Sequence, residues 1–222
     1  PSGGEFSEVS VSGDLITAGV GARFKKLSNI AKKNVVTGFE WMEGIPGNVG
    51  GGLRMNAGAM GVETFDQVVS VKFLDSEGRL HEKSSEELKA KYRNVPELKN
   101  NYAVSAVFKG GKGNLKEIEK LTQDSMVKRK ASQPIAASAG CIFKNPDHIP
   151  AGKLIEEIGM KGFNVGAARV SEVHGNFIIN EGGATAEDVL SLIDEVKKRA
   201  LEKCGVKLET EVQIIGEQQI AY

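Results

Sequence analysis

GIPGNVGGGLRMNAGAMG, residues 44–61, is the most informative stretch of this sequence. Glycines this dense leave the backbone bare, and bare amides can approach a pyrophosphate closely and donate hydrogen bonds to it. The order of residues matches neither G-x-G-x-x-G nor the Walker lysine loop, which argues against a Rossmann nucleotide fold and a P-loop NTPase. Residues 38–61 lack a clear hydrophobic period, so we predict a loop with at most short helical turns; a surface loop without a ligand is the alternative.

The segments that flank this stretch show strand and helix patterns. On its amino-terminal side, alternating runs predict a hairpin over residues 8–19, and apolar residues on one face predict a helix over residues 24–33. On its carboxyl-terminal side, the predicted elements are strands at 67–74, 79–83 and 102–109, a helical turn at 85–90 and an amphipathic helix at 114–130.

The character of the sequence changes near Ser132-Gln133-Pro134. Beyond it, Thr185 and Asp188 form a variant capping box that starts a helix, and Gly205 suits the end of that helix. The other elements predicted there are a helix at 151–158, short strands at 168–170 and 177–179, and a final strand at 207–215. Hairpins and separate helices indicate an α+β fold rather than a doubly wound sheet, and we place a domain boundary near residue 130.

Composition excludes several classes of function. Lys plus Arg and Asp plus Glu each total 29 in 222 residues, so the net charge of zero predicts no general attraction to nucleic acid or to an anionic membrane. No apolar run is long enough to span a bilayer, and we see no signal peptide. Three scattered histidines predict no metal site, while Cys141 and Cys204 read as thiols of a reducing cytoplasm.

Five motifs in this order resemble one family. They are GIPGNVGGGLRMNAGAMG (44–61), KYRN (91–94), SAGCIFKNP (138–146), VSEVHGNFIINEGGATAEDV (170–189) and LETEV (208–212). Together they resemble the UDP-N-acetylenolpyruvoylglucosamine reductases, from the first hairpin almost to the last residue. The resemblance implies the second lobe of a vanillyl-alcohol-oxidase-type FAD-binding domain, residues 1–130, followed by an α+β substrate-binding domain, residues 131–222. The first flavin-binding lobe is expected to be absent from this chain.

The resemblance also implies the chemistry. NADPH would reduce FAD, hydride would reach C3 of the enolpyruvyl group of a UDP-sugar, and C2 would be protonated, in a monomeric cytoplasmic enzyme of cell-wall synthesis. The residues expected to bind the cofactor are Gly44, Ile45, Pro46, Gly47, Asn48, Gly50, Gly51, Asn56, Ala57 and Gly58.

Arg93 and Glu211 match the catalytic arginine and glutamate of the family. A guanidinium carries a permanent charge and forks onto carboxylate oxygens, which suits an enolate intermediate. Glu209 and Glu211 are expected to share one face of the last strand, where Glu211 could orient Arg93 or donate a hydrogen bond to the enolate. Taken alone, Arg93 could be a surface arginine and Glu211 an exposed strand residue.

Cys141 stands where most of the family has the serine that protonates C2. A thiol has an ordinary pKa of about 8.5, so it is mostly protonated at neutral pH and can donate. A small buried core thiol is the alternative. Four further residues are expected to bind the substrate: Tyr92, Arg129, Lys144 and Asn145. Lys130 is as available as Arg129 for the substrate diphosphate.

Two other functions stay open on the sequence. One is a flavin-linked oxidase of the same superfamily that uses oxygen on an alcohol or sugar. The other is a non-catalytic fragment that only binds a sugar nucleotide.

Overall fold

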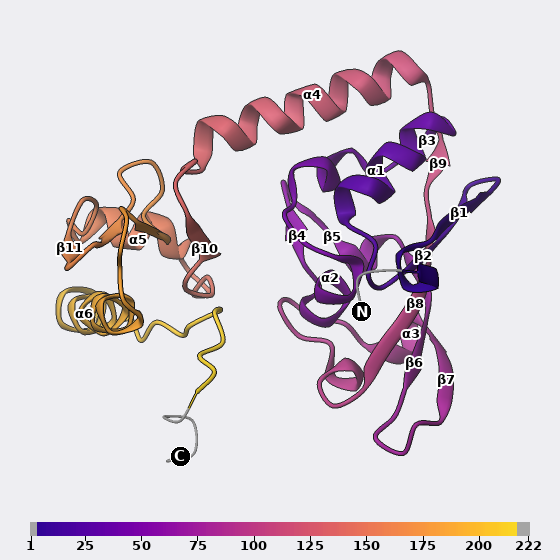
Figure 1. Ribbon diagram of the computed structural model, residues 1–222. Helices are drawn as coiled ribbons and strands as arrows, with labels where there is room; N and C mark the ends of the chain where they lie inside the picture. Colours follow the sequence, from indigo (N-terminus) through magenta and orange to yellow (C-terminus); the bar gives the residue numbers. More distant parts are fainter. Residues whose placement is uncertain (1–3, 217–222) are drawn as a thin grey trace. The chain divides into compact units, whose positions relative to one another are not determined.

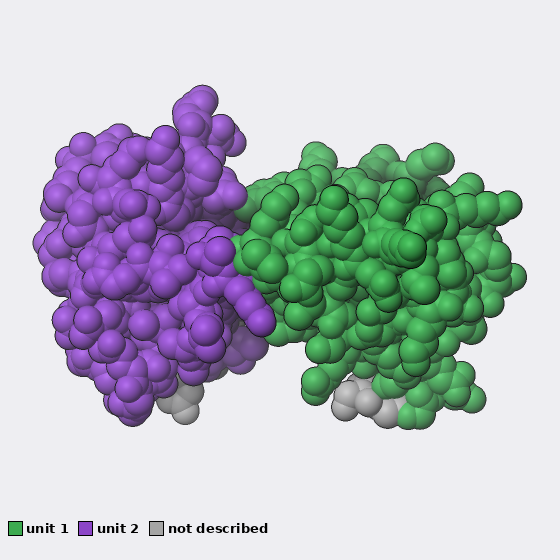
Figure 2. All heavy atoms as spheres, turned by 90° about the horizontal axis from the view of Figure 1, so that it is seen from above, with its two compact units in different colours: residues 1–129 green, residues 130–222 purple. Residues whose placement is uncertain are grey.

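The computed structural model describes residues 4–216 of the 222-residue chain. Contacts between Cα atoms divide the chain into two compact units, residues 1–129 (unit 1) and 130–222 (unit 2), coloured separately in Figure 2. The division falls inside helix α4, Leu115–Ser132.

Unit 1 is built on a five-stranded antiparallel sheet with the order β1-β2-β8-β6-β7. Its strands are β1 (Val9–Ser12), β2 (Leu15–Gly19), β8 (Tyr102–Lys109), β6 (Val68–Leu74) and β7 (Leu80–Ser84). Alternate residues of the central strands, such as Ile16 and Phe108, face one core together with Phe24 and Leu27 of helix α1 (Phe24–Lys33). The hairpin, helix α1 and strand β8 confirm the predictions for these segments (Figure 1).

Short elements complete unit 1. They are η1 (Gly4–Ser7), β3 (Val36–Thr37), η2 (Glu40–Gly44), α2 (Val49–Met55), β4 (Gly58–Ala59), β5 (Val62–Glu63), η3 (Thr64–Asp66), α3 (Ser85–Leu88), η4 (Pro96–Leu98) and β9 (Gly111–Lys112).

Unit 2 contains a four-stranded antiparallel sheet with the order β10-β13-β12-β11. Its strands are β10 (Ser138–Cys141), β13 (Phe177–Asn180), β12 (Ala168–Val170) and β11 (Asn164–Val165), and its helices are α5 (Ala151–Glu157) and α6 (Ala186–Cys204). The predicted capping box is confirmed, since Thr185 and Asp188 exchange hydrogen bonds at the start of α6. Gly205 ends α6 with a φ of 67°.

Two predictions about local structure were wrong. The glycine-rich stretch contains a seven-residue helix, α2, because Val49 and Leu53 are buried one turn apart and Gly52 lies against the ring of Phe24, where a Cβ would overlap it. The predicted final strand at 207–215 is absent from the described residues, where only Thr210 bridges to Phe143. Leu208 is buried, but residues from Gln213 to Gly216 are exposed and gain no partner strand.

Val35, just after α1, adopts a left-handed φ of 56° although it is β-branched. Its side chain is 38% exposed, so it contributes little packing. We expect Val35→Gly to raise the free energy of unfolding by about 1 kcal/mol, because glycine removes the left-handed strain at the end of the helix. Urea unfolding checks this. The control is Val69→Gly, at a comparably exposed strand position, which should destabilise; a less stable Val35→Gly variant would contradict the assignment.

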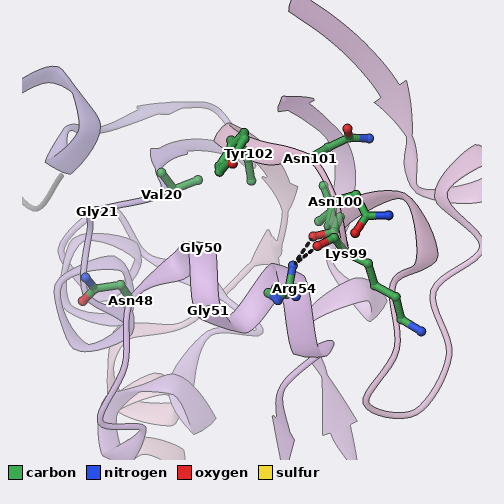
Figure 3. Close-up of a pocket in the computed structure, with 12 residues that line it drawn as sticks. Val20, Gly21, Asn48, Gly50, Gly51, Arg54, Lys99, Asn100, Asn101 and Tyr102 are labelled. Atoms are coloured by element: carbon green, nitrogen blue, oxygen red, sulfur yellow. Dashed lines mark hydrogen bonds between the residues drawn. The ribbon is translucent and has the colours of Figure 1, made fainter. Parts of the chain in front are cut away.

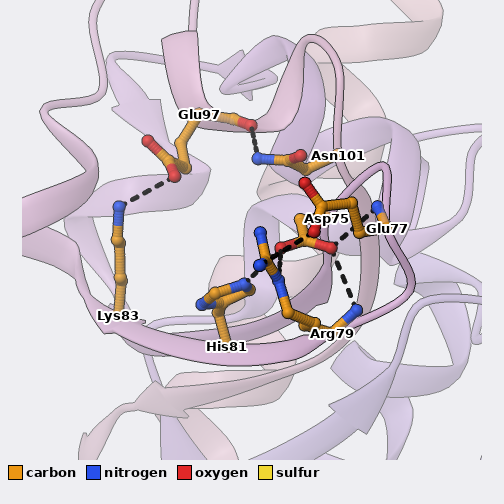
Figure 4. A network of polar contacts seen from close by, with 7 residues as sticks. All are labelled: Asp75, Glu77, Arg79, His81, Lys83, Glu97 and Asn101. Atoms are coloured by element: carbon orange, nitrogen blue, oxygen red, sulfur yellow. Dashed lines mark hydrogen bonds and ion pairs between the residues drawn. The ribbon is translucent and has the colours of Figure 1, made fainter.

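Asp75 organises the turn between β6 and β7 (Figure 4). Its carboxylate accepts hydrogen bonds from the backbone N–H groups of Glu77 and Arg79, both at 2.9 Å, and lies 2.8 Å from His81 Nε2 and Arg79 Nε. The hydrogen bonds from His81 and then Arg79 hold the pKa of Asp75 well below its usual range.

A carboxyl group whose pKa is lowered on folding stabilises the folded state above its unfolded pKa of about 4. This stabilisation is lost as the pH falls further. We therefore expect Asp75→Asn to lower the free energy of unfolding near pH 7. The difference in free energy of unfolding between the variant and the parent, called the gap below, should be smaller near pH 3. Urea unfolding at both pH values measures the gap, with Glu77→Gln as the control. A gap that is constant with pH would refute the ionic origin of this contribution.

Candidate functional site

A pocket of about 630 Å³ opens in unit 1 beside helix α2 (Figure 3). Arg54 of α2 bridges to the opposite wall, since its guanidinium donates to the carbonyl oxygens of Leu98 and Lys99, both at 2.6 Å. The lining residues are Val20, Gly21, Asn48, Gly50, Gly51, Arg54, Leu98, Lys99, Asn100, Asn101, Tyr102 and Ala103. Asn101 in turn donates to the backbone of Glu97, which pairs with Lys83 at 2.8 Å, so the 98–103 wall is tied to β7 (Figure 4).

The predicted cofactor glycines differ in what they offer a ligand. The amides of Val49 and Gly50 already donate to the carbonyls of Ala22 and Val20, at 2.8 and 2.9 Å. At Gly47 and Gly51, an added Cβ would meet no atom within 4 Å. A ligand can therefore approach the backbone at Gly47 and Gly51, while Gly50 serves packing against Val20.

The segment from Gly44 to Asn48 lines a second pocket, of about 470 Å³, together with Arg23, Lys25 and Glu43. Lys25 and Glu43 form an ion pair at 3.3 Å. Arg129 packs over this segment, because a Cβ on Gly44 would lie 2.7 Å from Arg129 Cδ. The structure thus places Arg129, predicted to bind substrate, against Gly44, which is predicted to bind the cofactor.

Asn56 connects the glycine-rich segment to the KYRN motif. It is buried, has a left-handed φ of 41°, and its side chain donates to Glu63 at 2.7 Å and to the carbonyl of Lys91 at 3.4 Å. The carbonyl oxygen of Asn56 accepts from Arg93 Nη1 at 3.5 Å.

Ala57 and Gly58 continue into the β4–β5 hairpin, where a Cβ on Gly58 would lie 2.5 Å from the carbonyl oxygen of Val62. The roles visible for Asn56 and Gly58 are therefore structural.

Arg93 occupies the strained position of a tight turn. Lys91 and Asn94 exchange backbone hydrogen bonds of 2.8 and 3.0 Å, and Arg93 between them has a φ of 52°. The guanidinium carbon lies 4.8 Å from the centre of the Tyr92 ring, in cation–π geometry. Arg93 is a bulky residue in a conformation that favours glycine, as are Val35 and Lys89 elsewhere in unit 1.

In unit 2, three predicted site residues, Cys141, Lys144 and Asn145, lie in residues 141–145, and a fourth, Glu211, is bonded to this segment. Cys141 ends strand β10, and its neighbour Ile142 accepts a hydrogen bond from the Glu211 amide at 2.8 Å. The Asn145 side chain accepts from the amide of Ala151 at 3.0 Å and thereby holds the start of α5. Neither Cys141 nor Cys204 forms a disulfide.

Lys144 and Glu209 pair across the same segment. The Lys144 amide donates to the Glu209 carbonyl at 2.9 Å, and the two side chains form an ion pair at 3.0 Å. The side-chain hydrogen bond from Lys144 and the charge of its ammonium group lower the pKa of Glu209. Arg93 and Tyr92 belong to unit 1, whereas Cys141, Lys144, Asn145 and Glu211 belong to unit 2.

Two residues that organise these regions were not predicted from the sequence. Arg54 braces the pocket wall, and the buried Asn176 hydrogen-bonds Phe143 beside the Cys141 segment. Both lie within motifs quoted above, GIPGNVGGGLRMNAGAMG and VSEVHGNFIINEGGATAEDV, but their hydrogen-bond partners are distant in sequence. Within residues 4–216, no cluster of three or more His, Cys, Asp or Glu could hold a metal ion, and no helix is long and apolar enough to cross a membrane.

Comparisons with known proteins agree with the geometry. The family model of the UDP-N-acetylenolpyruvoylglucosamine reductase C-terminal domain matches residues 132–215, and that of an FAD binding domain matches residues 4–84. These matches confirm the expected α+β flavin-binding fold with a following domain.

Individual relatives give the same result. UDP-N-acetylenolpyruvoylglucosamine reductase of Clostridium tetani is 43% identical over 97% of this chain and 71% of its own length, and that of Clostridioides difficile is 43% identical over 96% and 70%. The crystal structure of UDP-N-acetylenolpyruvylglucosamine reductase (MurB) from Thermus caldophilus has a TM-score of 0.83 at 36% identity, covering 95% of this chain and 75% of the other. This chain therefore belongs to the UDP-N-acetylenolpyruvoylglucosamine reductase family and carries an FAD-binding domain.

Proposed function

We propose that this chain catalyses the NADPH-driven, FAD-dependent reduction of UDP-N-acetylglucosamine enolpyruvate to UDP-N-acetylmuramate, in cytoplasmic peptidoglycan synthesis. Residues 1–130 would serve as a flavin-binding lobe and residues 131–222 as the substrate-binding domain of a monomer. The observation that carries the proposal is the link through Asn56, which ties the glycine-rich segment to the turn that carries Arg93.

The residues around the glycine-rich segment fit part of a flavin dinucleotide. Gly47 and Gly51 leave the backbone open to a ligand, and Asn48 lines both adjoining pockets. Gly44, Ile45 and Pro46 would extend the same wall. When bound and reduced by NADPH, the flavin would supply the hydride that adds to C3 of the enolpyruvyl group.

Arg93 would bind the substrate carboxylate and stabilise the negative charge that develops when C3 accepts hydride. A planar guanidinium suits this task because its charge is permanent and its donors match two carboxylate oxygens. Tyr92, stacked on Arg93, would hold the guanidinium in place.

Cys141 would complete the reduction by donating its thiol proton to C2, and the thiolate would then recover a proton from water. Glu211, whose amide is bonded to the residue after Cys141, would place a carboxyl group near the same intermediate. Lys144, Asn145 and Arg129 are proposed to contact the substrate.

An assay with added FAD tests the proposal against the oxidase alternative. We expect NADPH consumption that requires the enolpyruvyl sugar nucleotide, with UDP-N-acetylmuramate identified by mass spectrometry. Peroxide formation from an alcohol or sugar, without that requirement, would support the oxidase instead. Binding of the sugar nucleotide without turnover would support the non-catalytic alternative.

A further inference from the structure

Asn176 is a buried polar residue, and each of its side-chain and backbone nitrogen and oxygen atoms has a hydrogen-bond partner. Its side-chain oxygen accepts from the Phe143 amide at 2.8 Å, and its side-chain nitrogen donates to the Phe143 carbonyl at 2.8 Å. Its own carbonyl accepts from Ile142 at 2.9 Å, and its amide donates to His174 Nδ1 at 3.1 Å. Asn176 and Phe143 are 3% and 1% exposed, so water cannot replace these bonds readily.

The segment that Asn176 holds, residues 142–144, adjoins Cys141 and is bonded to Glu211, the two candidate catalytic residues of unit 2. Cys141 immediately precedes Ile142, and Ile142 accepts the Glu211 amide at 2.8 Å. Residues 142–144 are thus bonded to Asn176 and also to residues 209 and 211 of the carboxyl-terminal segment. A shift of this segment would move Cys141 and Glu211 together.

The chemistry of the contact requires an amide of this length. The side chain must accept from and donate to the same residue, which a carboxylate or a methyl group cannot do. The turn that presents Asn176 is itself tightly packed, because a Cβ on Gly175 would lie 2.5 Å from the carbonyl oxygen of Gly152, at the start of α5.

We infer that Asn176 is a positioning residue, which fixes the 142–144 backbone and thereby aims Cys141 and Glu211 at the substrate. This inference rests on the proposed function. It assigns Asn176 a task in the reaction without direct contact with the reacting atoms.

Two variants test the inference. Asn176→Asp keeps the size and the acceptor but loses the donor, and Asn176→Ala loses both. Val196→Ala, which opens a cavity in a buried face of α6, provides a control that destabilises the core of unit 2 while removing none of the hydrogen bonds to residues 142–144. We expect kcat to fall roughly 10- to 100-fold in both Asn176 variants with little change in KM, and to stay near the parent value in Val196→Ala.

A second readout is independent of turnover. In a Cys204→Ser background, we expect iodoacetamide to alkylate Cys141 about tenfold faster in Asn176→Ala, because the end of β10 opens more often. Asn176→Asp should be intermediate and Val196→Ala unchanged. If the parent shows no reductase activity, the proposed function fails, but the alkylation rates still decide whether Asn176 positions Cys141. An unchanged alkylation rate, or a kcat loss equal to that of Val196→Ala, overturns the inference.

Discussion

Arg93→Gly is expected to lower kcat roughly 100- to 1,000-fold while leaving the free energy of unfolding unchanged or higher. The loss of activity follows from removing the cation that stabilises the enolate. The retained stability follows from the left-handed φ of 52°, which glycine adopts without strain, because this relief offsets the loss of the 3.5 Å hydrogen bond to Asn56 and of the contact with the Tyr92 ring. Steady-state NADPH oxidation and urea unfolding of the same preparation measure the two effects.

Lys89→Gly is the matched control, because Lys89 is exposed and also has a left-handed φ, of 48°. It should gain stability without loss of kcat. Arg93→Lys should recover only part of the activity, since an ammonium keeps the charge but lacks the planar fork. An Arg93→Gly enzyme with parental kcat would remove Arg93 from the reaction.

Cys141→Ala is expected to lose most of the activity, whereas Cys141→Ser should keep much of it. A hydroxyl can still donate a proton to C2, but a methyl group cannot, and positioned proton donors contribute about 10²- to 10⁴-fold. Rapid-quench turnover measurements with the enolpyruvyl substrate compare the two variants.

The control for this pair is Cys204→Ala. Cys204 is exposed at the end of α6 and should tolerate the change. Full activity in Cys141→Ala would show that another group supplies the proton.

Local signals explain why parts of the fold could be predicted. The helical period of the apolar residues predicted α1, and the Thr185–Asp188 capping box predicted the start of α6. Helix α2 could not be predicted in this way, because its glycines disfavour a helix, and burial of Val49 and Leu53 together with the packing of Gly52 on Phe24 compensates. Residues 207–215 have the alternating pattern of a strand. Thr210 nevertheless forms only an isolated bridge, to Phe143, because the segment opposite is the short 142–144 stretch.

The candidate site was predicted through motifs, and its geometry depended on bonds between distant residues. The Asn56–Lys91 and Asn176–Phe143 contacts join positions 35 and 33 residues apart, so no local sequence pattern predicts them. The strain at Arg93 is equally invisible in the sequence, since it follows from the Lys91–Asn94 pairing.

A double-mutant cycle on kcat with Arg93→Ala and Cys141→Ala tests most directly whether these two residues serve one reaction. Groups that act on the same intermediate show strongly non-additive losses, whereas independent sites contribute losses that multiply. We predict that the double variant turns over about as slowly as the slower single variant. Losses that multiply in full would contradict a shared role for Arg93 and Cys141.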